Sequence, residues 1–155
     1  MLYLVRHAKA GNRHDFTGND RLRPLSASGK LQARAIAAAL VADGVQSLIS
    51  SPYLRCIQTL QPTAKLIGAK VATDDSLSEG RSPTEVLKLL ESLPDGAAAC
   101  GHGDVIPETI AALERRGCKL TSAPDWRKAT VWVLDRGADG EISTASVWPP
   151  PVISS

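Results

Sequence analysis

Short apolar runs alternate with longer segments of helical periodicity along most of the chain, and this alternation limits the folds that are open to it. The predicted strands cover residues 2–5, 45–50, 69–74 and 97–100. The predicted helices cover residues 26–44, 51–68 and 82–93, and a fourth follows "GHGD" and stops at Gly117. Strands and helices in this order form a mostly parallel sheet that is covered on both faces.

Two late apolar segments, 129–135 and 141–148, are joined by the Gly-containing stretch "RGADG", which predicts an antiparallel hairpin. We therefore expect an α/β fold: a three-layer α/β/α arrangement with a mostly parallel central sheet. The length of 155 residues suits a single domain, which we expect to span residues 1–148. Prolines cannot continue a sheet, so "WPPPVISS" predicts a loosely held tail at residues 149–155.

Local signals predict where three helices begin. Ser26 or Ser28 is the expected cap of the first helix. Ser51 is the expected cap of the second, with Pro52 at its first helical position. The stretch "SPTE" at residues 82–85 has the pattern of a capping box for the third.

Composition argues against several classes of protein. A net charge of +2 with 43% apolar residues describes an ordinary globular chain and gives no reason to expect a nucleic-acid partner. No uncharged apolar run approaches the roughly 20 residues that span a bilayer, and Arg6 interrupts the first apolar run too early for a signal peptide. Three cysteines without metal-like spacing indicate reduced thiols. We expect a cytoplasmic protein with no membrane partner.

Cationic side chains follow several of the predicted strands at the point where each strand ends. Arg6 and His7 follow the first strand, Arg55 comes soon after the second, and His102 follows the fourth between two glycines. The carboxyl ends of parallel strands meet at one edge of a sheet, where ligands bind. Guanidinium groups match phosphate oxygens, and glycines allow a backbone to approach an anion closely. The sequence therefore predicts a phosphate site at this edge.

Three motifs, "LVRHA", "SSPYLRCIQT" and "GHGD", together resemble the histidine phosphatase superfamily, in order and over nearly the whole chain. The stretch "RPLSASGKLQA" resembles the small, SixA-like branch, which is associated with phosphohistidine phosphatase activity. The chain is also similar to the phosphatase domain that is appended to some Nudix hydrolases. That second resemblance implies nucleotide phosphates as substrates.

The resemblance also implies roles for individual residues. His7 matches the nucleophile of the family, which becomes a transient phosphohistidine. Arg6, Arg55 and His102 match the groups that hold the phosphoryl oxygens together with His7 and stabilise the charge of phosphoryl transfer. Ala8 stands where the larger family has glycine, a change that SixA-like relatives tolerate.

The general acid is less defined by the pattern. The stretch "DDSLSEG" resembles the segment that supplies the proton donor in mutase-like relatives, and the donor would then be Glu79. A solvated loop carboxylate is the alternative interpretation of Glu79. Asp15, Asp20 and Asp104 are the other candidates for this role.

Further cations lie in the loop from Lys9 to Arg23, which also contains Arg13, His14 and Arg21. They could meet a second phosphate or an acidic protein face, or could simply be solvated. Cys56 lies beside Arg55, but no cysteine has the downstream arginine of a thiol phosphatase, so we expect Cys56 in the core. No metal-binding motif is present in the sequence.

These observations lead to one functional hypothesis. We expect a metal-independent phosphatase without a cofactor that uses a covalent intermediate on His7 and acts on protein phosphohistidine. Nucleotides or other small phosphate esters are the alternative substrates. A phosphate-binding module without turnover is the non-enzymatic alternative.

Overall fold

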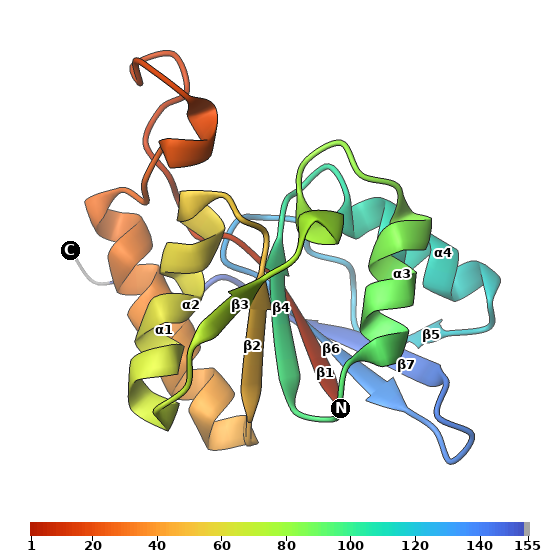
Figure 1. Ribbon diagram of the computed structural model, residues 1–155. Coiled ribbons are helices and arrows are strands. Elements are labelled where there is room, and N and C mark those ends of the chain that lie inside the picture. Colours follow the sequence, from red (N-terminus) through yellow and green to blue (C-terminus); the bar gives the residue numbers. More distant parts are fainter. Residues whose placement is uncertain (154–155) are drawn as a thin grey trace.

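The computed structural model describes residues 1–153, and its centre is a seven-stranded sheet (Figure 1). The strands are β1 (Leu2–Arg6), β2 (Ser47–Ser50), β3 (Val71–Thr73), β4 (Ala97–Gly101), β5 (Lys119–Leu120), β6 (Val131–Arg136) and β7 (Ile142–Trp148). The α-helices are α1 (Ala27–Asp43), α2 (Leu54–Ile67), α3 (Pro83–Ser92) and α4 (Ile106–Arg115), and two short 3-10 helices cover Asp20–Leu22 and Asp75–Leu77.

The strand order across the sheet is β3-β2-β4-β1-β6-β7-β5. The first four strands of this order are parallel, β6 is antiparallel to both of its neighbours, and β5 is parallel to β7. The mostly parallel sheet and the late hairpin of β6 and β7 are therefore confirmed. The two-residue strand β5 was not predicted from the sequence.

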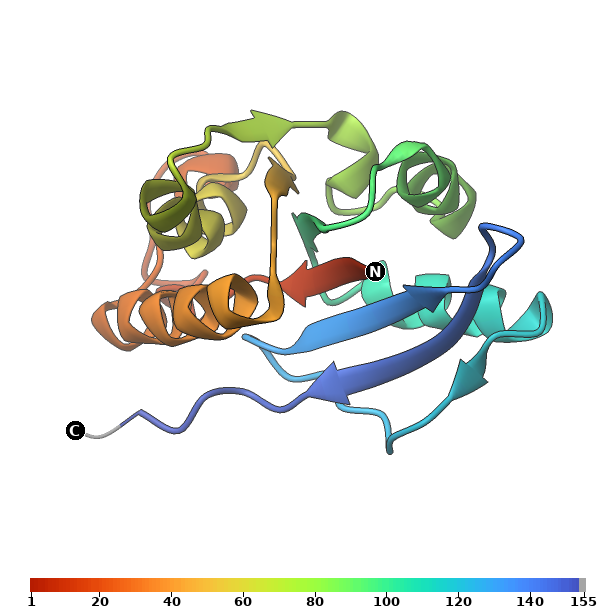
Figure 2. The ribbon, with the colours of Figure 1, turned by 90° about the horizontal axis from the view of Figure 1, so that it is seen from below.

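Successive side chains of β1 point to opposite faces of the sheet and enter two separate cores. Leu2 and Leu4 pack with buried residues of α3 and α4. Tyr3 and Val5 pack with buried residues of α1 and α2. The two pairs of helices cover opposite faces of the sheet (Figures 1 and 2), which confirms the three-layer architecture.

Helix α1 begins as its sequence predicts. Ser26 is the N-cap, and its hydroxyl accepts a hydrogen bond from the Gly29 amide at 3.1 Å. Gly44 ends the helix in a left-handed conformation with φ of 96°. The choice between Ser26 and Ser28 is thus decided in favour of Ser26.

The predicted starts of α2 and α3 are wrong in part. Helix α2 begins at Leu54 with Tyr53 as its cap, so Pro52 lies before the helix. The Ser51 hydroxyl bonds to the His102 ring and accepts the Tyr53 amide at 3.3 Å, so it caps no residue within the helix. Ser82 is the N-cap of α3 as predicted, but its side chain makes no capping hydrogen bond.

The segment after β7 is described through residue 153 and contains no regular secondary structure in that range. Residues 154–155 of the predicted tail lie outside the described residues. The domain boundary at Trp148 stays a prediction. Within residues 1–153, no helix is long and apolar enough to cross a membrane.

Candidate active site

The sheet register brings the two histidines of the predicted site together. Arg6 of β1 is paired with Gly101 of β4, so His7 and His102 are the first residues beyond two adjacent strands. The His7 amide donates to the Gly101 carbonyl at 3.1 Å, and the two imidazole rings meet edge to face with centroids 5.5 Å apart. The predicted convergence at the carboxyl edge of the sheet is observed for both residues.

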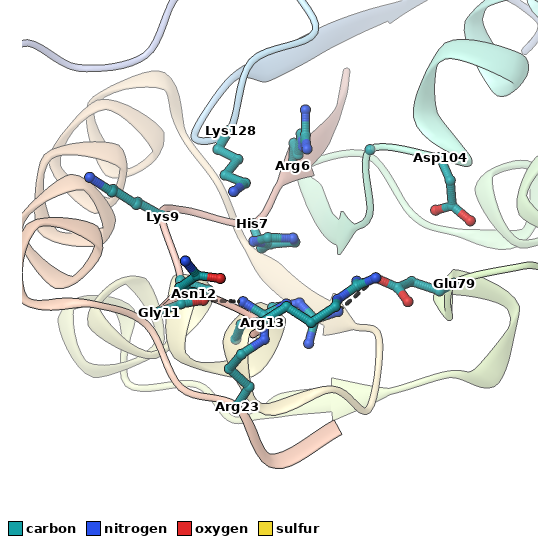
Figure 3. A pocket seen from close by; sticks show the side chains of 13 residues that line it. Arg6, His7, Lys9, Gly11, Asn12, Arg13, Arg23, Glu79, Asp104 and Lys128 are labelled. Atoms are coloured by element: carbon teal, nitrogen blue, oxygen red, sulfur yellow. Dashed lines mark hydrogen bonds and ion pairs between the residues drawn. The ribbon is translucent and has the colours of Figure 1, made fainter. Parts of the chain in front are cut away.

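A cavity of about 690 Å³ opens at this edge of the sheet (Figure 3). Six of the side chains that line it are cationic, and two are carboxylates. The cationic residues are Arg6, Lys9, Arg13, Arg23, Arg55 and Lys128; the carboxylates are Glu79 and Asp104; the others are His7, Ala10, Gly11, Asn12 and Gly103. Such a lining favours an anionic ligand.

His7 is held in one tautomer by the backbone. Its Nδ1 lies 2.8 Å from the Ala8 carbonyl, which can only accept a hydrogen bond, so Nδ1 carries the proton and Nε2 keeps its lone pair. His7 is only 5% exposed. Burial lowers its pKa to about 3, and the nearby His102, Arg55 and Arg6 act in the same direction. The ring is therefore a neutral base over the physiological pH range.

His102 lies next to His7, is almost completely buried, and is not among the residues that line the cavity. Its Nε2 is hydrogen-bonded to the Ser51 hydroxyl at 2.9 Å, and the Cys56 thiol lies 3.5 Å from the same nitrogen. Its Nδ1 lies 3.5 Å from Glu79 Oε1. Cys56 has no exposed surface, in agreement with its predicted place in the core.

Arg55 is fully buried at the start of α2, and its guanidinium group meets two carboxylates. Its Nη2 donates to Glu79 Oε1 at 2.7 Å and to Asp20 Oδ2 at 3.2 Å. Its Nη1 donates to the Asp20 carbonyl at 3.0 Å, and the group lies over the Tyr53 ring, 4.9 Å from the centroid. A bound phosphoryl group would therefore have to compete with these carboxylates for Arg55.

Arg6 lies against the glycine that follows His102. A Cβ atom on Gly103 would overlap the Arg6 guanidinium group, so a larger residue there would displace the guanidinium from this position. Arg6 Nη1 donates to the Trp126 carbonyl. The expected close approach at Gly103 thus serves the arginine rather than leaving the backbone itself open to an anion.

Several buried nitrogens of this site have no hydrogen-bond partner within residues 1–153. They are Arg6 Nε, Arg55 Nε and His102 Nδ1. Buried polar groups are normally satisfied, so these unpaired nitrogens can accept a partner from outside the chain. Nitrogens of this kind suit phosphoryl oxygens. The described residues contain no cluster of three or more His, Cys, Asp or Glu side chains that could hold a metal ion.

The four candidate acids differ in position. Glu79 lines the cavity and pairs with Arg55, and it also lies 3.3 Å from Arg13 Nη2. Asp104 lines the cavity too and accepts the Gly80 amide. Asp20 pairs with Arg55 and is hydrogen-bonded to Arg23, which lowers its pKa. Asp15 does not line the cavity.

Several cations of the loop from Lys9 to Arg23 are in contact with other side chains. Arg13 and Arg23 pair with Asp20, at 3.7 and 2.9 Å, and Arg21 lies over the Tyr53 ring. One charged residue that lines the cavity, Lys128, was not predicted from the sequence, because it stands in a loop with no local signal for the site.

The fold and the cavity define the chain as an α/β protein with a cation-lined cavity at the carboxyl edge of its sheet, where His7 and His102 meet. The family model described as histidine phosphatase superfamily (branch 1) matches residues 2–85. The chain belongs to this superfamily.

Individual relatives point in two directions. The chain is 32% identical to the 8-oxo-(d)GTP phosphatase of Mycolicibacterium smegmatis; the match covers 96% of this chain and 48% of the relative, so the chain spans about half the length of that protein. The structure is similar to a putative phosphohistidine phosphatase SixA from Nakamurella multipartitia, with a TM-score of 0.75, 28% identity and coverage of 97% and 96% of the two chains. A putative SixA from Agrobacterium tumefaciens has a TM-score of 0.68 at 24% identity, with coverage of 87% and 90%.

Proposed function

We propose that the chain hydrolyses phosphoryl compounds through a covalent phosphohistidine on His7. The observation that carries this proposal is the hydrogen bond from His7 Nδ1 to the Ala8 carbonyl. It leaves Nε2 as a neutral nucleophile in a cavity lined by cations.

The reaction has two balanced steps. In the first, His7 Nε2 forms a bond to phosphorus while the bond from phosphorus to the leaving oxygen or nitrogen breaks. Arg6, Arg55 and His102 stabilise the charge on the transferred group, and Glu79 gives a proton to the leaving atom. In the second step, water attacks phosphorus, its proton returns to Glu79, and the bond to Nε2 breaks to release phosphate.

The proposed substrate is phosphohistidine on a protein. The 28% identity to a putative SixA, over nearly the full length of both chains, supports this class. Nucleotides or other small phosphate esters are the second candidate. The 32% identity to an 8-oxo-(d)GTP phosphatase and the six cations of the cavity favour it.

Rapid alkaline quench with a ³²P-labelled phosphoryl donor tests the covalent step. We expect an acid-labile, base-stable label on the native chain and none on His7→Ala. We expect slower labelling of His102→Ala, because that residue stabilises charge and forms no bond. His14→Ala is the matched control, since His14 does not line the cavity, and it should label normally. Label that persists on His7→Ala would remove His7 as the nucleophile.

A panel of substrates tests the proposed substrate class and the proposed independence from metal. We would compare kcat/KM for a phosphohistidine protein, nucleoside diphosphates and triphosphates, and sugar phosphates, with and without a chelator. Activity that is lost with the chelator would contradict the proposed metal-independent reaction. Binding of phosphate compounds without any labelling or turnover would support the non-enzymatic alternative for this chain.

A further inference from the structure

Lys128 lies in the loop before β6, and this loop is fastened to the end of β1. The Ala129 amide donates to the His7 carbonyl at 3.1 Å. The Arg6 amide donates to the Thr130 carbonyl at 3.0 Å, and the Arg6 side chain donates to the Trp126 carbonyl. The backbone on both sides of Lys128 is therefore fixed relative to the proposed nucleophile.

The backbone next to Lys128 adopts a conformation that side chains disfavour. Ala129 has φ of 67°, and no other non-glycine residue within residues 1–153 has a positive φ. Its side chain is buried, so the surrounding structure holds this conformation in place. Strained backbone of this kind persists where packing over-determines it, and it is often found beside functional groups.

Lys128 lines the same cavity as His7, and Figure 3 shows its side chain extending toward the His7 ring. No carboxylate of the described chain lies within 4.0 Å of its ammonium group. Partial burial lowers the pKa of Lys128, and the positive charges of Arg6, Arg23, Lys9 and Arg55 lower it further. An amine held among other cations is stabilised by an anion.

Four of the other five cations of the cavity have identifiable partners or tasks. Arg13 and Arg23 are paired with Asp20, and Arg55 is paired with Asp20 and Glu79. Arg6 and Arg55 have the unpaired buried nitrogens that suit the transferred phosphoryl group. Lys128 is left without either role. Lys9 also lines the cavity, but its side chain points away from His7 in Figure 3.

We propose that Lys128 binds a second anionic group next to the transferred phosphoryl group, so that the site accepts diphosphate esters. The terminal phosphoryl group would face His7, and the inner phosphate would lie against Lys128. This inference rests on the proposed function and favours the second of its substrate classes. An acidic side chain beside a protein phosphohistidine is the competing occupant.

Calorimetric titration of the full chain separates the two phosphate positions without any turnover. The probes are methylenediphosphonate, which carries two linked anionic groups and is not hydrolysed, and methylphosphonate, which carries one. In Lys128→Gln, we expect the affinity for the diphosphonate to fall about tenfold more than the affinity for methylphosphonate, as for the loss of one charged hydrogen bond. Lys128→Arg should restore most of the difference.

The control is Lys119→Gln, which removes an exposed lysine of β5 that does not line the cavity. It should change neither affinity. If Lys128→Gln lowers the affinities for both probes equally, Lys128 contributes only to the overall positive potential of the cavity. That result would overturn the proposal. Unchanged binding of the diphosphonate would overturn it as well.

A turnover experiment then distinguishes the two occupants. In Lys128→Gln, the ratio of kcat/KM for a nucleoside diphosphate to that for nitrophenyl phosphate should fall about tenfold. If the relative kcat/KM falls more for a phosphohistidine peptide with acidic neighbours than for the diphosphate, Lys128 binds an acidic group of a protein substrate. The diphosphate proposal would then be wrong. Because the titration requires no catalysis, an inactive chain that still shows the diphosphonate effect would refute the proposed function and leave the subsite standing.

Discussion

At the scale of single residues, the environment of His7 gives the folded and unfolded chains different proton affinities. Burial lowers the pKa of folded His7 to about 3, whereas an unfolded histidine has a pKa near 6.5. Between these values, the unfolded chain binds a proton that the folded chain does not bind. Stability must therefore fall as the pH drops through this window.

We predict that the free energy of unfolding of the native chain falls more steeply on acidification than that of His7→Gln. The difference should be about 1.4 kcal/mol per pH unit below the unfolded pKa. Urea titrations of both proteins at pH 7.5, 6.0 and 5.0 measure it, and the comparison removes the contributions of all groups that the two proteins share. Parallel pH dependences would show that folded His7 takes up its proton as readily as unfolded His7.

Glu79 is in contact with Arg55 and Arg13, so two roles are open to it: proton donor and ion-pair partner. Glu79→Gln separates them, because the amide oxygen can still accept from Arg55 while the acid is lost. As a proton donor, Glu79 is needed most where the leaving group is a strong base. We predict that phosphorylation of Glu79→Gln by alkyl phosphates falls by about a hundred- to ten-thousand-fold, and phosphorylation by nitrophenyl phosphate far less. Phosphohistidine should give an intermediate loss.

Single-turnover rates of the first step provide this measurement, since the same carboxylate also acts in the second step. Asp104→Asn is the matched control, because Asp104 is the other carboxylate that lines the cavity. A uniform loss for all three substrates in Glu79→Gln would leave Glu79 with an ion-pair role alone. If Asp104→Asn shows a loss of rate that is selective for alkyl phosphates, Asp104 is the proton donor in place of Glu79.

At the scale of secondary structure, the start of α1 depends on a close approach to the segment after β1. The Ser26 amide donates to the Lys9 carbonyl at 3.0 Å, and a Cβ on Gly29 would overlap the same carbonyl oxygen. Alanine is favoured over glycine by about 1 kcal/mol inside a helix, so propensity alone would make Gly29→Ala stabilising. The overlap is with backbone, which cannot turn aside as a flexible side chain can.

We predict that Gly29→Ala instead lowers the free energy of unfolding by about 1–3 kcal/mol, the usual range for overpacking. It should also reduce turnover, because Lys9 is two residues from His7. Urea unfolding and kcat/KM for nitrophenyl phosphate test both effects. The control is Ala38→Gly at an exposed position of α1, which should cost about 1 kcal/mol through propensity and leave turnover unchanged. A Gly29→Ala protein more stable than the native chain would contradict the packing argument.

The sequence predicts secondary structure correctly where local periodicity determines it. The prediction is wrong where a tertiary contact determines where an element begins. Helix α1 and its Ser26 cap follow from local pattern. The start of α2 does not, because Ser51 bonds to a histidine 51 residues away. Strand β5 has two residues, too few for any periodicity.

At the scale of the whole molecule, most of the site could be predicted without knowing the strand order. Arg6, His7 and His102 lie directly at the ends of parallel strands, and such ends share one edge whatever their order. Lys128 could not be found in this way, since it reaches the site only through the pairing of β6 with β1, which sequence periodicity does not specify. Its place depends on hydrogen bonds between segments more than 100 residues apart.

The extent of the domain is the last prediction, and we propose that it ends with Trp148. This residue is paired with Val131, and its ring lies 6.0 Å from that of Tyr3, so it completes the sheet. Beyond it, Pro149 and Pro151 line a pocket of about 200 Å³ beside α1. A chain that stops at Trp148 should fold cooperatively and lose less than about 1 kcal/mol, or about 2–4 °C in Tm.

A second truncation, after Thr144, provides the contrast. It removes buried Ala145 together with Trp148 and shortens the ladder between β6 and β7, so it should prevent cooperative folding. Thermal unfolding followed by circular dichroism and turnover of nitrophenyl phosphate measure both chains. If the chain that stops at Trp148 also loses cooperative unfolding, the segment after β7 contributes to folding and belongs to the domain. The physical reason would be that the sheet leaves a face of α1 uncovered, which the prolines must then cover.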